Sequence, residues 1–240
     1  GREVPRLEAG LRVGISIVVP VLDEAGGIAA ALDALAPLRE RGHEVIVVDG
    51  GSRDGTPDLA RGAADRVVTA PRGRASQMNA GAAIARGEVL LFLHADARLP
   101  ADADERILRG LASGGRAWGR FDVRIEGASR LFPLIAFFMN LRSRATGIAT
   151  GDQAMFVHRE TFERAGGFPA LELMEDIALS HSLKRLSPPL CLRDRAVTSG
   201  RRWERRGVLR TVLLMWRLRL AFFLGASPAK LARVYDGKSG

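Results

Sequence analysis

The stretch Val47-Val-Asp-Gly-Gly-Ser-Arg-Asp-Gly-Thr56 carries an apolar run directly into a glycine-containing loop. The apolar run starts at Glu44, and its β-branched residues are typical of a strand that is buried on both faces. Pro57 follows the loop and suits the first turn of a helix, which Asp54 or Thr56 would cap. The stretch therefore predicts a strand, a tight turn and a helix in direct succession, which is the repeating unit of α/β folds.

The same succession occurs on both sides of this stretch. Strands are predicted at 13–21, 44–49, 66–69 and 89–94. Helices are predicted between them at 23–38, from 57 onward and at 75–85. Strands joined by helical crossovers form a parallel sheet with helices on both faces, and ligands bind beyond the carboxyl ends of its strands. The expected fold class is therefore α/β, with a mostly parallel, doubly wound sheet.

The pattern weakens after residue 100. The elements predicted there are helices at 101–111 and 172–186, strands at 117–125 and 155–158, and an apolar segment at 131–141. We expect a disordered leader at 1–13, one α/β domain at 14–205 and a segment of amphipathic helices at 206–240. The leader lacks the apolar core of a secretory signal, and Cys191, the one cysteine, excludes an intrachain disulfide. Both observations suit a cytoplasmic protein.

The chain is basic, with 36 Lys and Arg against 27 Asp and Glu and a formal charge of +9. A surface of that sign attracts nucleic acid, anionic lipid or nucleotide diphosphates, and charge alone does not choose among them. Arginines spread along a whole chain are also what a GC-rich genome produces. Because the sequence has a single tyrosine and no recognisable nucleic-acid module, we expect no nucleic-acid partner.

Acidic motifs follow the first two predicted strands. After the first come Pro20, Asp23 and Glu24, where proline fixes the direction of the chain and a carboxylate could accept a hydrogen bond from a nucleoside. At a helix start both acids would equally suit the helix dipole. The second motif, from Asp49 to Asp54, is either a ligand-binding loop or a plain tight turn. A dinucleotide site is excluded, because no Gly-x-Gly-x-x-Gly opens the first helix.

A third motif ends the fourth predicted strand, where His94 and Asp96 stand two residues apart. Since residues i and i+2 of a strand point the same way, the imidazole and the carboxylate should converge. Together with phosphate oxygens, such a pair suits Mg²⁺ or Mn²⁺. A histidine in a strand also commonly has a structural role.

The order of these motifs resembles that of the family 2 glycosyltransferases, whose fold is called GT-A, over most of residues 14–205. The resemblance implies a divalent metal, Mn²⁺ or Mg²⁺, and a UDP- or GDP-sugar as donor. The family's Asp-x-Asp metal motif is matched by His94-Ala95-Asp96, a form that resembles a bacterial subgroup of radical-SAM and selenodomain-associated transferases. His94 and Asp96 are then the expected metal ligands. The residues expected at the donor are Pro20, Asp23, Glu24, Asp49, Gly50, Ser52, Asp54, Arg74, Asn79, Asp96 and Arg202.

The resemblance also implies an acceptor site in the second half of the chain. A Gly-Gly-Phe turn at 166–168 precedes Glu175 and Asp176, and the family pattern makes Asp176 the general base with Glu175 in support. Without the resemblance, both acids would be helix N-terminal charges. One base and no protein nucleophile imply inversion at the sugar carbon. Ser199 stands where processive members carry glutamine ahead of Arg-Trp, so we do not expect polymer synthesis.

Two apolar segments, at 131–141 and 208–224, are too short or too interrupted by arginine to span a membrane. They would either pack on the core or lie in the interface of an anionic membrane. The second arrangement would bring the protein to a lipid-linked hydroxyl acceptor at the inner face of the cell membrane.

The expected function is therefore transfer of a sugar from a nucleotide diphosphate to a hydroxyl acceptor. One alternative is a catalytically degenerate protein that only binds a nucleotide sugar, which the replacement at His94 suggests. Another is a nucleotidyltransferase, which would normally need a glycine-rich first turn that carries a lysine. The sequence has no lysine before Lys184.

Overall fold

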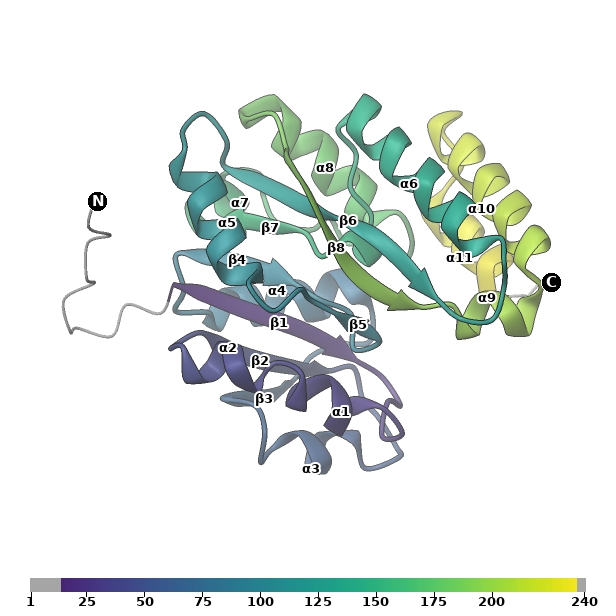
Figure 1. Ribbon diagram of the computed structural model, residues 1–240. Coiled ribbons are helices and arrows are strands. Elements are labelled where there is room, and N and C mark those ends of the chain that lie inside the picture. The colour runs from purple at the N-terminus through teal and green to yellow at the C-terminus, as the bar shows by residue number, and fades with distance from the viewer. Residues whose placement is uncertain (1–13, 237–240) are drawn as a thin grey trace.

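The computed structural model describes residues 14–236, so the expected leader at 1–13 lies outside the described residues. These residues form an eight-stranded sheet in the order β3-β2-β1-β4-β7-β6-β8-β5 (Figure 1). The strands are β1 (Ile15–Val21), β2 (Glu44–Asp49), β3 (Arg66–Thr69), β4 (Val89–Phe92), β5 (Ala97–Arg98), β6 (Trp118–Glu126), β7 (Phe156–His158) and β8 (Leu190–Ser199). Strands β1 to β4 are parallel, which confirms the parallel arrangement predicted for the first half.

The second half makes the sheet a mixed one. Strand β7 runs antiparallel to both β4 and β6, and β5 runs antiparallel to β8. Strands β6 and β8 are parallel. The α/β fold class is confirmed, but the sequence analysis did not find β8, because Arg193, Asp194 and Arg195 interrupt its apolar residues.

Helices cover both faces of the sheet. They are α1 (Ile28–Asp33), α2 (Ala36–Glu40), α3 (Thr56–Ala60), α4 (Arg74–Ile84), α5 (Ala103–Ala112), α6 (Phe132–Thr146), α7 (Arg159–Arg164), α8 (Glu175–Leu186), α9 (Arg201–Arg206), α10 (Val208–Phe223) and α11 (Pro228–Asp236), with a 3₁₀ helix at Gly151–Gln153. Alternate residues of β1 enter separate apolar clusters: Ile17 packs in the cluster that contains Leu32 of α1, and Val18 in the one that contains Met78 of α4. Burial on both faces explains the unbroken apolar run of this strand.

The single helix predicted at 23–38 is wrong. Residues 22–27 form a loop, and the two short helices α1 and α2 follow it. Asp23 has a left-handed backbone, with φ at 52°, which a right-handed helix does not accommodate. Asp23 therefore does not start a helix, and the reading of this acidic pair as helix-start charges is excluded.

The prediction that strand 89–94 carries His94 is also wrong. Strand β4 ends at Phe92, and the chain turns so that the N–H of Ala97 donates to the carbonyl of His94 at 3.0 Å. The alternation that holds along a strand does not apply to this turn. His94 and Asp96 consequently have no common direction imposed by strand geometry.

Helices α6, α10 and α11 stand beside the second half of the sheet (Figure 1). Leu218 of α10 and Leu231 of α11 are buried with Ile148 and Ile177, so one side of α10 packs on the core. Its other side is exposed, with Trp216 68% accessible. None of the helices between residues 14 and 236 is long and apolar enough to cross a bilayer.

Candidate active site

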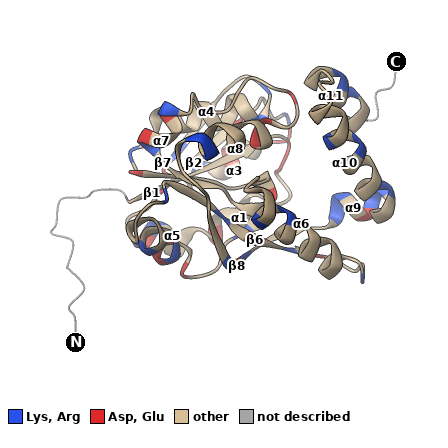
Figure 2. Cartoon of the chain, turned by 90° about the horizontal axis from the view of Figure 1, so that it is seen from above, with Lys and Arg blue, Asp and Glu red and all other residues tan. Residues whose placement is uncertain are grey.

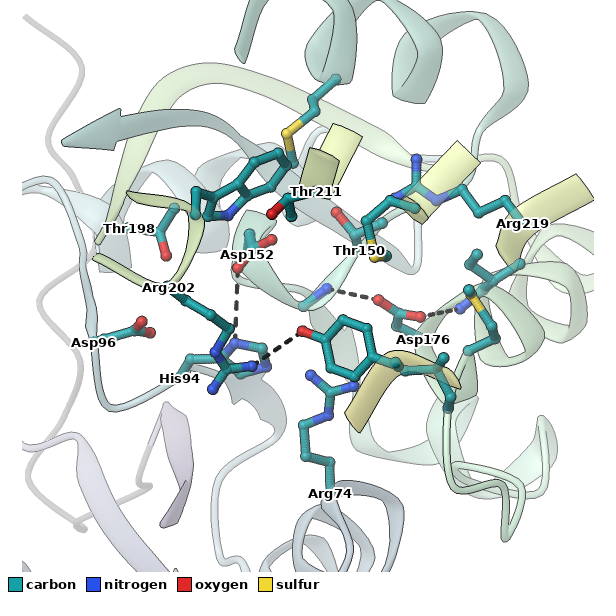
Figure 3. Close-up of a pocket in the computed structure, with 18 of the residues that line it drawn as sticks. Arg74, His94, Asp96, Thr150, Asp152, Asp176, Thr198, Arg202, Thr211 and Arg219 are labelled. Atoms are coloured by element: carbon teal, nitrogen blue, oxygen red, sulfur yellow. Dashed lines mark hydrogen bonds and ion pairs between the residues drawn. The ribbon is translucent and has the colours of Figure 1, made fainter. Parts of the chain in front are cut away.

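A cavity of about 700 Å³ opens beyond the carboxyl ends of β1 and β4, the edge at which α/β sheets bind ligands (Figure 3). Helices α6, α9, α10 and α11 form its far wall. The predicted site residues that line it are Pro20, Glu24, Arg74, His94, Asp96, Asp176 and Arg202. Those outside its lining are Asp23, Asp49, Gly50, Ser52, Asp54, Asn79 and Glu175.

Two of the predicted donor loops hold each other in place. The backbone N–H of Asp23 donates to Oγ of Ser52 at 2.8 Å, and the N–H of Arg53 donates to Oδ1 of Asp23 at 2.8 Å. Asp54 accepts from the N–H of Ala25 at 2.9 Å. It also accepts from the N–H of Thr56 at 3.0 Å, but the N-cap of α3 is Gly55 and has no side-chain cap, so the expected capping by Asp54 or Thr56 is wrong. These side chains therefore fix the loop that carries Glu24 into the cavity.

Asp49 and Gly50 lie beneath these loops. The buried carboxylate of Asp49 accepts from the N–H groups of Gly51 and Ser52, which closes the turn after β2. A Cβ on Gly50 would lie 3.0 Å from the amide of Gln77, so this position leaves no room for a side chain. Gln77 in turn donates to the carbonyls at the ends of both β1 and β2. Because these bonds hold the Gln77 amide in place, a side chain at position 50 would strain this packing.

Asn79 lies away from the cavity that it was expected to line. Its amide donates to the carbonyl of Phe168 at 2.8 Å and accepts from the N–H of Phe168 at 2.9 Å. This pair of bonds ties helix α4 to the Gly-Gly-Phe turn, 89 residues further along the chain. In this structure the amide of Asn79 is bonded to that turn. To contact a diphosphate, it would have to break both hydrogen bonds.

An imidazole and two carboxyl groups line one side of the cavity, from His94, Asp96 and Glu24. Burial and the neighbouring Arg74 lower the pKa of His94 to about 4, so its imidazole is neutral near pH 7, the form that binds metal ions. Burial and Asp96 raise the pKa of the Glu24 carboxyl. The closest acid to the imidazole is Asp152, with Oδ1 3.9 Å from Nδ1.

These side chains suit a divalent ion but do not enclose one by themselves. Between residues 14 and 236 no group of three or more histidine, cysteine, aspartate or glutamate side chains converges as a metal site. A neutral imidazole and a carboxylate are ligands that Mn²⁺ accepts, and phosphate oxygens of a bound nucleotide complete such sets. The donor set at His94 and Asp96 therefore fits an ion that binds together with a nucleotide.

Two arginines face the same space, each held by a neighbour. Nε of Arg74 lies 2.8 Å from Oε1 of Glu175, and Nη1 of Arg202 donates to the hydroxyl of Tyr235 at 3.1 Å. Glu175 is itself buried and does not line the cavity. Burial and Asp176 raise the pKa of Glu175 to about 7, although Arg74 acts in the opposite direction. Glu175 thus positions the Arg74 side chain although Glu175 itself lies outside the cavity lining.

Asp176 reaches the cavity from the first turn of α8. Its Oδ2 accepts from the N–H of Gly151 at 2.9 Å, and its Oδ1 accepts from the N–H of Ile177 at 2.7 Å (Figure 3). Met174, just before the helix, and Ala154 both have left-handed backbones, with φ at 70° and 45°. Such strain at residues other than glycine gathers where a structure fixes functional groups. One oxygen lone pair on each side of the carboxylate remains available.

Several cavity residues were not among the predicted ones. Burial raises the pKa of Asp152, which lies in the 3₁₀ helix before β7. Arg142 of α6, Arg219 of α10 and Tyr235 of α11 also line the cavity. The run Gly151-Asp-Gln153 held a signal for Asp152, and the arginines were visible only as interruptions in apolar helices. No sequence pattern indicated that they share a cavity with Asp176.

The fold places this chain among the α/β proteins of the GT-A type. The family model for glycosyl transferase family 2 matches residues 16–165. The chain therefore belongs to glycosyl transferase family 2, and the resemblance seen in the sequence is confirmed at that level. The alternative of a nucleotidyltransferase finds no support in this match.

Curated relatives match parts of the chain. The undecaprenyl-phosphate 4-deoxy-4-formamido-L-arabinose transferase of Pseudomonas paraeruginosa is 29% identical over 151 residues, 58% of this chain and 44% of that protein. A PGL/p-HBAD biosynthesis glycosyltransferase of Mycobacterium bovis is 36% identical over 88 residues, 34% of each chain. The chain thus spans less than half the length of these relatives.

Solved structures share the fold. The mannosyltransferase PcManGT of Pyrobaculum calidifontis, in complex with GDP-Man and Mn²⁺, has a TM-score of 0.64 and 24% identity, covering 95% of this chain and 65% of its own. The glucosyl-3-phosphoglycerate synthase of Mycobacterium tuberculosis, in complex with Mn²⁺, UDP and glucosyl-3-phosphoglycerate, has a TM-score of 0.59 and 19% identity, covering 82% and 77%. At these identities the likeness establishes the GT-A fold.

Proposed function

We propose that this protein is an inverting, metal-assisted glycosyltransferase that moves a sugar from a UDP- or GDP-sugar to a hydroxyl acceptor. The observation that carries the proposal is the continuity of one cavity, which joins Asp96 on one side to Asp176 on the other (Figure 3). A reaction of this kind needs a place for a departing diphosphate and a base for the acceptor within one enclosed space. The cavity offers both.

The donor would bind at the side formed by Glu24, His94 and Asp96. Arg74 and Arg202 present guanidinium groups suited to phosphate oxygens, and each is already oriented by a neighbour. A bound Mn²⁺ or Mg²⁺, held by Asp96, neutral His94 and donor oxygens, would neutralise the diphosphate as it leaves. The solved relatives that contain GDP-Man or UDP with Mn²⁺ support this donor class.

The residues behind the donor wall would shape the nucleoside end. Asp23, Asp49, Gly50, Ser52 and Asp54 fix the two loops through the hydrogen bonds described above, and we assign the base and ribose to that side. The His-Ala-Asp form of the metal motif favours the radical-SAM and selenodomain-associated subgroup. That subgroup assignment rests on the motif alone.

Asp176 would act as the general base. The two backbone N–H groups on its carboxylate hold it in one orientation and leave a lone pair on each oxygen for the acceptor hydroxyl. As the hydroxyl oxygen bonds to the anomeric carbon, its proton passes to Asp176 and the bond to the diphosphate breaks. Attack from the side opposite the leaving group inverts the carbon.

We assign catalysis to residues 14–205 and closure of the cavity to the segment that follows. Tyr235 of α11 holds Arg202, and Arg219 of α10 lines the acceptor side. The C-terminal helices would therefore contribute to binding as well as packing on the core.

Exposed apolar side chains support a peripheral contact with the inner face of the cell membrane. Those on α6 and α10 are Leu134, Phe137, Phe138, Leu141, Leu209, Leu213, Trp216, Leu220 and Phe223, each more than half exposed. Lysines and arginines lie along α9, α10 and α11, which form a column beside the sheet (Figure 2). An apolar surface edged by positive charge suits an anionic bilayer. The undecaprenyl-phosphate transferase among the relatives supports a lipid-linked acceptor.

The first experiment is a thermal-shift series with UDP, GDP, CDP and dTDP, each with and without Mn²⁺, on the wild type and on Asp96→Ala. We expect one nucleotide to raise Tm in a metal-dependent way, and Asp96→Ala to lose that rise. Metal-dependent hydrolysis of the matching sugar nucleotide without acceptor would then separate an enzyme from a degenerate binding protein. If none of the four nucleotides changes Tm, with or without Mn²⁺, the proposal is contradicted.

A further inference from the structure

Two arginines on the acceptor side of the cavity have buried donor atoms without partners. Nε and Nη2 of Arg142 and Nε of Arg219 are inaccessible to solvent and make no hydrogen bond with any residue in the range 14–236. Neither guanidinium lies within 4 Å of a carboxylate in that part of the chain. Buried donors of this kind are costly when left unpaired, so the arrangement calls for an anionic ligand.

The two guanidinium groups belong to facing walls and act on each other. Arg142 lies on α6 and Arg219 on α10, and both line the cavity. Burial and the proximity of Arg219 lower the pKa of Arg142 to about 10. Burial likewise lowers the pKa of Arg219, against the field of Asp176. Two like charges that lie close together, each with donor atoms shielded from water, suit a ligand that carries more than one negative charge.

The position of the pair separates it from the donor side. In Figure 3, Arg219 lies beside Asp176 at one edge of the view, whereas Asp96 lies at the other. The same two helices contribute apolar side chains to the cavity lining, among them Phe138 of α6 and Trp216 of α10, which are both more than half exposed. An occupant of this side therefore meets two cations and an apolar passage that continues outward.

We propose that Arg142 and Arg219 bind the phosphate of the acceptor, and that the acceptor is an amphiphile whose apolar chain lies between α6 and α10. That this ligand is the acceptor of a sugar rests on the proposed function. The phosphate is a recognition group and is unchanged by the reaction: a hydroxyl of the same molecule bonds to the anomeric carbon, its proton passes to Asp176, and the nucleoside diphosphate departs. Arginine forks recognise phosphate oxygens two at a time, which a lysine would not reproduce.

The test uses dodecyl phosphate below its micellar concentration as the probe. Its binding is followed by calorimetry and by tryptophan fluorescence, since Trp203 and Trp216 line the cavity. The variants are Arg142→Gln, Arg219→Gln and, as a matched control, Arg217→Gln, an exposed arginine on the same helix as Arg219. We expect binding at least tenfold weaker in the first two and unchanged in the third. Inorganic phosphate and dodecanol should each bind far more weakly than the probe.

Folding is tested with the same samples. Glutamine removes a buried charge that has no partner, so we expect Tm of Arg142→Gln and Arg219→Gln to equal or exceed that of the wild type. If either variant fails to fold, Arg142→Lys and Arg219→Lys replace it, because lysine keeps the charge and loses the fork. We then expect binding of dodecyl phosphate to remain severalfold weaker than in the wild type.

Four outcomes would overturn the inference. Equal loss of binding in Arg217→Gln would mean attraction by surface charge alone. Equal affinity for dodecanol would mean recognition of the apolar chain without the phosphate. Weaker binding of UDP or GDP with Mn²⁺ in Arg142→Gln or Arg219→Gln would assign the pair to the donor. If nucleotides bind normally while dodecyl phosphate does not, only this inference fails; if no nucleotide binds while dodecyl phosphate does, the proposed function fails instead.

Discussion

Nε of Arg74 lies 2.8 Å from Oε1 of Glu175, and this ion pair joins the first residue of helix α4 to the first residue of helix α8. The second carboxylate oxygen of Glu175 is buried and has no hydrogen-bond partner among the described residues. One oxygen therefore positions a cavity arginine while the other is buried without a hydrogen bond. Burial raises the pKa of this carboxyl group and Arg74 lowers it, and the effect of burial is the larger.

This relationship predicts a pH-dependent stability. The pKa of Glu175 in the folded protein is about 7, above its ordinary 4.5. Between these values the folded protein keeps a proton that the unfolded chain releases, so the contribution of this group to the free energy of unfolding falls as pH rises from 4.5 to 7. The full fall is about 3 kcal/mol. Urea unfolding of wild type and Glu175→Gln across this range should show the variant without this slope; parallel curves would contradict it.

Asp176→Asn should abolish turnover while it preserves donor binding. The amide keeps the size of the side chain but cannot accept the acceptor proton, and a general base contributes about 10²–10⁴-fold in rate. We expect the metal-dependent thermal shift with the preferred nucleotide to remain within experimental error of the wild type. Sugar transfer measured at saturating donor gives the rate. Retained transfer would remove Asp176 from the role of base and make Asp152, which also lines the cavity, the next candidate.

Gly151→Ala should disturb the metal side through His94. A Cβ at this position would lie 2.5 Å from the imidazole, so the ring must move. We expect the Mn²⁺-dependent part of the nucleotide thermal shift to shrink. Gly62→Ala is the control, since a Cβ there meets nothing within 4 Å. An unchanged Mn²⁺ response in Gly151→Ala would argue that His94 does not hold the metal.

Asn79→Ala separates a structural from a ligand-binding role. The substitution leaves the backbone N–H and carbonyl of Phe168 without their partner, which should cost about 1–3 kcal/mol of stability. Denaturant unfolding measures that loss. Nucleotide affinity, measured by calorimetry well below the lowered Tm, should stay within about twofold of the wild type if the amide serves only the turn. A much larger loss of affinity would restore Asn79 to the donor site.

Membrane contact is tested on residues that lie outside the cavity lining. Phe137→Gln with Leu213→Gln removes two exposed apolar side chains, one from α6 and one from α10. Burial of such side chains contributes about 1.5–3 kcal/mol each when complete. We expect the double variant to bind vesicles of anionic phospholipid at least tenfold more weakly in a flotation assay, with unchanged Tm. Leu59→Gln, which changes a leucine of α3 that is also more than half exposed, should bind as the wild type does.

The first half of the fold could be predicted because its signals are local. Strands β1, β2 and β4 are short apolar runs between glycine, proline and acidic residues, and burial on both faces makes them stand out. The second half depends on pairs that are distant in sequence. Strand β8 carries three consecutive charged residues and forms because β6 and β5 flank it, which no window of sequence reveals.

The candidate site divides in the same way. Asp96, His94 and Arg74 follow or begin elements that the sequence marks, so their arrival at one sheet edge was foreseeable. The donor role of Asn79 stays a prediction, and its bonds to Phe168 could not be foreseen, because the sequence does not show which partner an amide on a helix meets. Arg142 and Arg219 were missed because only tertiary packing brings α6 and α10 around one space, and an arginine in an apolar helix more often faces water.

The place of β8 in the sheet has a consequence for the newly made chain. Gly119 pairs with Leu190 and Glu126 with Ser199, whereas β6 meets its other neighbour, β7, only at Trp118 and Gly119. At ~5–20 residues per second, a ribosome needs roughly 3–13 s to go from residue 126 to residue 190. For those seconds most of β6 is an open edge, ready to pair with another nascent chain. Slow codons in this interval would lengthen that exposure and increase the dependence of the yield on chaperones.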